Sequence, residues 1–152
     1  MWLTAMKSEP AFWDTSAVAP LCVSQSTTAA SHRMMQKGHS LVVWWATPVE
    51  VISAFARLEL AGSLDAEDLK RAMAKLTRLR DTWVEIVPSD RVRGRAEAFP
   101  RAHKLRAGDA FQLAASLAWC AERPQGRPFV CMDHRLAAAA RDVGFTVFSD
   151  TI

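Results

Sequence analysis

Two aspartates in this sequence each follow a short, strongly apolar run. Asp14 comes directly after Ala-Phe-Trp, and Asp133 directly after Phe-Val-Cys-Met. Such runs predict buried strands, and a buried strand can deliver a carboxylate to the rim of a sheet. Two further acids, Glu50 and Asp109, stand near expected helix starts. We expect these four acids to meet in space and to hold a divalent metal ion.

Each of the four acids also has a purely structural explanation. Asp14 and Asp133 precede expected helices, where aspartate is a favoured N-cap. Asp109 lies in an expected first helical turn, where the helix macrodipole favours a negative charge. Glu50 stands three residues after Thr47, so it could close a capping box by reaching back to the Thr47 amide.

The position of the acids within the expected fold favours a shared site. In an open parallel α/β sheet, the carboxyl ends of the strands and the starts of the following helices lie at one edge, where ligands bind. Four carboxylates gathered there repel one another, and their burial costs desolvation. A hard cation relieves both effects, and ligands that are all oxygen select Mg²⁺ or Mn²⁺ over zinc. Such a site can activate water and stabilise charge on a phosphodiester.

The segments that would position these acids alternate between strand and helix patterns. This alternation predicts a parallel sheet flanked by helices. The length of 152 residues fits one domain, 1–152, in which 1–10 is a loose lead-in. The expected strands end at Asp14 or cover 40–45, 83–87, 129–132 and 145–148, and the expected helices cover 26–37, 47–61, 65–80, 108–122 and 136–143.

The helix expected over 47–61 has two apolar stripes. Val51, Phe55 and Leu58 form one stripe, and the second consists of Val49, Ile52 and Ala56. A helix that is apolar on so much of its circumference is either deeply buried or shared with a partner chain. This pattern keeps a second function class open, in which the protein is a binding module and the acids only cap helices.

The charge balance suits a polyanionic partner. The net charge is +3, and with four acids gathered in one pocket, 19 basic residues face 12 acidic ones elsewhere, a balance of +7. The segment 91–106 is strongly basic and leads directly to Asp109, so it either holds phosphates beside the pocket or is an ordinary charged helix.

The three cysteines and the absence of targeting signals predict a cytoplasmic protein. Cys22, Cys120 and Cys131 are scattered in apolar surroundings and form no C-x-x-C pair, which is typical of reduced, buried thiols. The first residues do not form a signal peptide, and no apolar run approaches the roughly 20 residues of a membrane span. We therefore expect no membrane association.

In the order and spacing of these motifs, the chain resembles PIN-domain ribonucleases, and most of all the toxins of bacterial VapBC-type toxin–antitoxin pairs. The resemblance extends over about 11–148. It rests on the segments 12–17, 47–51 with Ala54, 105–114 and 129–136.

The resemblance implies a three-layer α/β/α sandwich with a central, mainly parallel sheet of four to five strands. It places the acidic quartet of the family on Asp14, Glu50, Asp109 and Asp133, and Ser16 matches a polar position that supports the metal site. The implied activity is endonucleolytic cleavage of RNA that depends on Mg²⁺ or Mn²⁺. The implied partners are the RNA substrate, a cognate antitoxin and a second copy of the chain in a homodimer.

The chain departs from the family pattern at two positions. It has Cys131 where members often have Thr, and Arg135 where they often have a further acid, which bears on a second metal position. Two alternatives to the toxin ribonuclease remain: a non-catalytic PIN-fold interaction module, and a PIN-like nuclease that acts on DNA or in RNA processing. The sequence contains no H-E-x-x-H, phosphate-binding or dinucleotide-binding motif.

Overall fold

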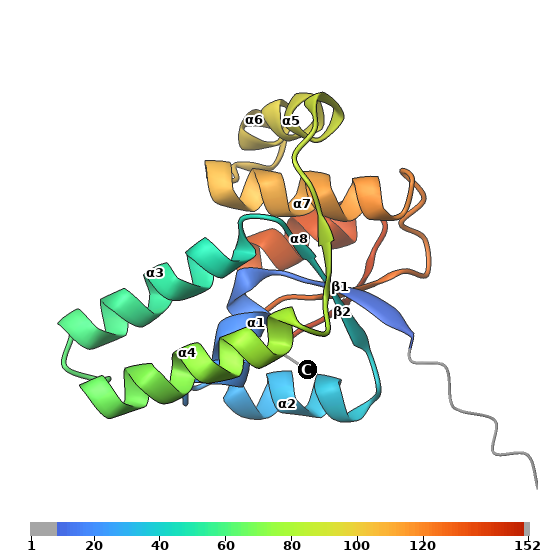
Figure 1. Ribbon diagram of the computed structural model, residues 1–152. Coiled ribbons are helices and arrows are strands. Elements are labelled where there is room, and N and C mark those ends of the chain that lie inside the picture. Colours follow the sequence, from blue (N-terminus) through green and yellow to red (C-terminus); the bar gives the residue numbers. More distant parts are fainter. Residues whose placement is uncertain (1–8, 151–152) are drawn as a thin grey trace, which may run out of the picture.

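Five parallel strands form one central sheet in the computed structural model, which describes residues 9–150 (Figure 1). The strands are β1 (Pro10–Trp13), β2 (Ser40–Trp44), β3 (Val84–Ile86), β4 (Pro128–Val130) and β5 (Thr146–Phe148). The helices are α1 (Thr15–Cys22), α2 (Thr28–Gln36), α3 (Thr47–Leu60), α4 (Ala66–Arg80), α5 (Asp90–Glu97), α6 (Phe99–His103), α7 (Ala107–Trp119) and α8 (His134–Val143). The strand order is β3-β2-β1-β4-β5, with every neighbouring pair parallel.

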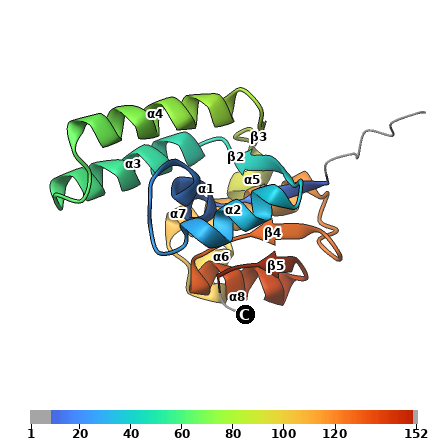
Figure 2. The ribbon, with the colours of Figure 1, turned by 90° about the horizontal axis from the view of Figure 1, so that it is seen from below.

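Alternation of side chains along the strands divides the interior into two cores. Within β1, Ala11 and Trp13 face one core and Phe12 faces the other, because successive strand residues point to opposite faces. Helices α1 to α4 supply the first core and α5 to α8 the second. Figure 2 shows α1, α2, α3 and α4 gathered on one side of the sheet. The expected α/β/α sandwich is therefore confirmed.

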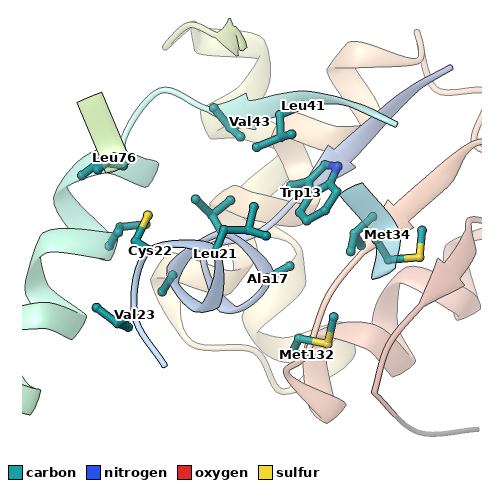
Figure 3. Close-up of a cluster of buried hydrophobic side chains, with 14 of the residues drawn as sticks. Trp13, Ala17, Leu21, Cys22, Val23, Met34, Leu41, Val43, Leu76 and Met132 are labelled. Atoms are coloured by element: carbon teal, nitrogen blue, oxygen red, sulfur yellow. The ribbon is translucent and has the colours of Figure 1, made fainter. Parts of the chain in front are cut away.

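The first core is built around Trp13. Figure 3 shows its indole close to Leu41 of β2, with Leu21 of α1 and Met34 of α2 nearby. Trp13 is fully buried, as expected for the last apolar residue before Asp14. This packing fixes the end of β1, and with it the backbone from which Asp14 projects.

The long helices α3 and α4 lie side by side and extend beyond the end of the sheet (Figures 1 and 2). On α3, Val51 and Phe55 are fully buried, whereas Val49 is 70% exposed and Ile52 is 37% exposed. The first expected stripe therefore packs into the core, and the second is not covered by this chain.

The basic segment 91–106 forms two short helices, not one. It is divided between α5 and α6, and Lys104 then adopts a left-handed backbone conformation, with φ of 55°, before α7 begins. Pro10 already belongs to β1, and the rest of the expected lead-in, apart from Glu9, lies outside the described residues. No helix between residues 9 and 150 has the length and apolarity needed to cross a bilayer.

Candidate active site

The ends of β1 and β4 meet at the point where the strand order reverses. The chain runs outward from β1 through β2 to β3, and later returns to the other side of β1 with β4 and β5. Trp13 pairs with Val130, and the amide of Asp14 donates to the Val130 carbonyl at 3.1 Å. Such a switch point leaves a crevice beyond the carboxyl ends of the strands. Asp14 and Asp133 both follow strands that end there.

All four acids expected from the sequence line one pocket at this edge. The pocket has a volume of about 380 Å³, and its wall includes Asp14, Glu50, Asp109 and Asp133. Ser16 lines the same pocket, so the structure brings together all five of the expected site residues. The acids come from four separate parts of the chain: the loop after β1, α3, α7 and the loop after β4.

Asp14 is the most deeply buried of the four. It is 3% exposed, and burial raises its pKa from 3.8 to about 7, with hydrogen bonding from Ser16 opposing this and the charges of Asp109 and Asp133 adding to it. Asp14 occupies the N-cap position of α1, but its side chain makes no capping hydrogen bond. The backbone amide of Ser16 still lowers the pKa of Asp14, but this effect does not offset the cost of burying the carboxylate.

Ser16 joins the two strand ends that carry aspartates. Its hydroxyl donates to Asp14 Oδ1 at 2.5 Å and accepts from the amides of Met132 and Asp133 at 2.8 and 3.0 Å. One donor and two acceptor positions are all that a serine hydroxyl offers, so its hydrogen-bonding capacity is used completely. A single side chain thus fixes the position of Asp14 relative to Asp133.

Asp133 combines a structural role with a place in the pocket. Its Oδ1 accepts from the Leu136 amide at 2.8 Å and caps α8, as the sequence indicated. Asp109 lies in the first turn of α7, half-buried. Burial and the charge of Asp133 raise the pKa of Asp109, and the guanidinium groups of Arg106 and Arg135 act in the opposite direction.

The capping box expected between Thr47 and Glu50 is wrong. Ala46 is the N-cap of α3, Thr47 is the first helical residue, and no side chain caps this helix. Glu50 instead accepts a hydrogen bond from Thr15 Oγ1 to Oε2 at 3.1 Å. Partners from other elements therefore determine the direction of this carboxylate. Burial raises the pKa of Glu50, and hydrogen bonds from Thr15 and Gln112 partly offset this.

Gln112 is a site residue that the sequence reasoning missed. Its side chain is 1% exposed, and Nε2 lies 3.3 Å from Glu50 Oε1, 3.1 Å from Thr15 Oγ1 and 3.2 Å from Thr47 Oγ1. The signal in the sequence was a polar residue one turn after Asp109 in an otherwise apolar helix. Gln112 links α7 to α3 and orients Glu50.

The donor set fits a hard divalent cation in type. Four carboxylates offer only oxygen ligands, and burial, with a smaller contribution from the charges of Asp109 and Asp133, raises the pKa of Asp14. Within residues 9–150, however, no three His, Cys, Asp or Glu side chains are already placed so that they could hold one ion. The carboxylates line the pocket, and side-chain rotations would be needed to complete a coordination sphere.

Comparison with known proteins supports the fold. No protein-family model and no curated protein matches the sequence. The chain is similar to a solved chain of a toxin–antitoxin complex from Klebsiella pneumoniae, with a TM-score of 0.54 and 17% identity over 81% of this chain and 86% of that one. It is also similar to a chain of FitAcB from Neisseria gonorrhoeae, with a TM-score of 0.55 and 14% identity over 90% and 95% of the two chains. At these identities the likeness concerns the fold alone.

Proposed function

We propose that this protein is a PIN-type endoribonuclease that depends on Mg²⁺ or Mn²⁺, and that it is the toxin of a toxin–antitoxin pair. The observation that carries the proposal is the convergence of Asp14, Glu50, Asp109 and Asp133 on one pocket at the switch point of the sheet. Asp133 caps α8 and Asp109 lies in the first turn of α7, but no local rule accounts for four acids from distant segments meeting in one place.

In this proposal the four acids have different roles, which follow from their surroundings. Asp14, Asp109 and Asp133 would hold the ion, and Glu50 would ligate it or orient the attacking water. When bound, the ion would activate water and stabilise charge on the phosphodiester. Ser16 sets the spacing between Asp14 and Asp133, and Gln112 directs Glu50 toward the pocket. Both act as positioning residues.

The toxin assignment rests on the fold and on an uncovered apolar surface. One structural neighbour belongs to a toxin–antitoxin complex, with the same sandwich over most of both chains. Val49, Ile52 and Leu60 on α3 are exposed, Leu60 by 89%, and exposed apolar side chains that recur along a helix suit a protein partner. We assign this surface to the antitoxin or to a second copy of the chain.

The decisive experiment is cleavage of RNA by the purified protein. Wild type should cut a mixed RNA substrate in Mg²⁺ or Mn²⁺ and stop when EDTA is added. Asp14→Asn should lose cleavage while its circular dichroism spectrum stays unchanged, and Asp142→Asn, which alters a 70%-exposed side chain, should retain it. Cleavage by Asp14→Asn at the wild-type rate would refute the assignment. Preferential cleavage of DNA of the same sequence would favour the DNA-directed alternative.

A second candidate function is a non-catalytic interaction module of the same fold. The exposed stripe of α3 favours it, because that stripe provides a partner surface without any use of the acids. Calorimetric titration with Mn²⁺ separates the two functions. Heat of binding that disappears in Asp14→Asn supports the nuclease, whereas no heat and no thermal stabilisation of wild type support the module.

A further inference from the structure

A second hollow lies against the acid pocket and adds three basic side chains to two acids that it shares with that pocket. It has a volume of about 370 Å³ and is lined by Arg106, Asp109, Asp133, His134 and Arg135. Asp109 and Asp133 line both spaces, so the acid pocket and this hollow adjoin at that pair. The two spaces together form a continuous polar surface at the carboxyl edge of the sheet.

The basic residues of this hollow lie at the amino ends of helices, where a positive charge is unfavourable. Arg106 is the N-cap of α7, and His134 and Arg135 are the first two residues of α8. The amino end of a helix carries a partial positive charge that repels cations. Stabilisation of the helices therefore does not explain these residues.

The charges of Arg106 and Arg135 lower the pKa of Asp109, but neither guanidinium group is held in a direct ion pair within residues 9–150. Both side chains are exposed. His134 Nε2 lies 3.9 Å from Asp150 Oδ1. Within the basic segment 91–106, Arg93 pairs with Asp90 and Arg95 pairs with Glu122. Two guanidinium groups without a direct ion pair therefore line the same hollow, beside Asp109.

The chemistry of this hollow matches a phosphate. The guanidinium group is a planar fork of donors that binds phosphate oxygens in pairs, and two helix amino ends add further positive potential. A pocket with four carboxylates repels the RNA backbone, and a single divalent ion offsets only part of that charge. Cations immediately outside the acid pocket would counter this repulsion.

We propose that the hollow formed by Arg106, His134 and Arg135 binds the RNA phosphate next to the one that is cleaved. This inference rests on the proposed nuclease function. It assigns Arg106, from the basic segment, to substrate binding, and it adds Arg135, from a different element. The Asp109–Asp133 wall places this phosphate directly beside the reaction site.

A binding experiment tests the subsite without relying on cleavage. Two proteins are titrated in EDTA with a fluorescent single-stranded oligoribonucleotide. One carries Asp14→Asn alone, and the other carries Asp14→Asn together with Arg106→Gln and Arg135→Gln. Loss of these charge-assisted hydrogen bonds should weaken binding roughly 10- to 100-fold. The slope of log K against log salt should decrease in magnitude by about 0.7, as for one lost phosphate contact.

The matched control removes the same charge elsewhere. Arg123→Gln with Arg141→Gln alters two exposed arginines outside the hollow and changes the net charge equally. We expect this pair to change affinity by less than about threefold, because long-range charge effects are screened by salt. Equal losses in the two double variants would overturn the subsite and leave a general charge effect in its place.

A cleavage experiment connects the subsite to the reaction. Wild type should cut a trinucleotide, which has a phosphate flanking the cleaved one, faster than a dinucleotide without it, and the Arg106→Gln, Arg135→Gln protein should lose this preference. If wild type cuts RNA and the double variant binds and cuts equally well, the subsite fails and the nuclease stands. If wild type binds RNA through these arginines but never cuts it, the nuclease fails and the anion site stands.

Discussion

Asp14→Asn should stabilise the metal-free protein, because Asp14 is a charged group kept out of water by the fold. Asparagine has nearly the same shape, and its side-chain oxygen can still accept the hydrogen bond from Ser16. The substitution therefore removes a charge and preserves the packing around a side chain that is only 3% exposed. It isolates the electrostatic cost of gathering carboxylates in this pocket.

The magnitude follows from the pKa of Asp14. Burial raises the pKa from 3.8 to about 7, so above pH 7 the ionised carboxylate costs the folded state about 4 kcal/mol relative to the unfolded chain. Between pH 4 and 7 the folded protein binds more protons than the unfolded chain, so stability falls as pH rises. At pH 5 the cost is only about 2 kcal/mol. Asparagine does not titrate and avoids the cost at every pH.

Urea unfolding in EDTA at pH 5 and pH 8 measures this difference. Relative to wild type, Asp14→Asn should gain about 4 kcal/mol at pH 8, a rise in melting temperature of about 10 °C for a chain of this length, and about half as much at pH 5. The control Asp142→Asn should stay within about 0.5 kcal/mol of wild type. Equal stability of wild type and Asp14→Asn at pH 8, or a gain independent of pH, would refute the claim of an uncompensated buried charge.

Two further substitutions test the positioning residues. Ser16→Ala leaves the Met132 and Asp133 amides without their acceptor, so urea unfolding should show a loss of about 2–4 kcal/mol, and an unchanged stability would contradict the proposed link between the strand ends. Gln112→Leu removes a donor that lowers the pKa of Glu50, so that pKa should rise and the acidic limb of the cleavage–pH profile should move to higher pH. A profile that keeps its position would show that Glu50 does not need to be ionised.

The sequence predicted the elements of the fold well where burial is continuous. The apolar runs before Asp14 and Asp133 gave strands within a residue or two of β1 and β4, because strands buried on both faces carry uninterrupted apolar side chains. The order of strands and the single orientation of the sheet depend on contacts between distant segments, which periodicity does not encode. The expectation of a mainly parallel sheet is met by a fully parallel one.

The sequence predicted which acids line one pocket, but not the contacts that hold them there. Glu50 fitted a local capping pattern, yet Thr15 and Gln112 from other elements hold it. Local rules describe neighbours within one turn, and these partners are 35 and 62 positions away. Gln112 was missed for the same reason, since its role is visible only when α7 packs beside α3.

Because the Ser16 hydroxyl is held by amides more than a hundred positions further along the chain, synthesis itself controls when the pocket exists. A ribosome-bound fragment that ends before β4 lacks Asp133. It also lacks the Met132 and Asp133 amides that hold Ser16 beside Asp14. If the site cuts RNA, the growing chain stays harmless to the message that encodes it until β4 and Asp133 have emerged and folded.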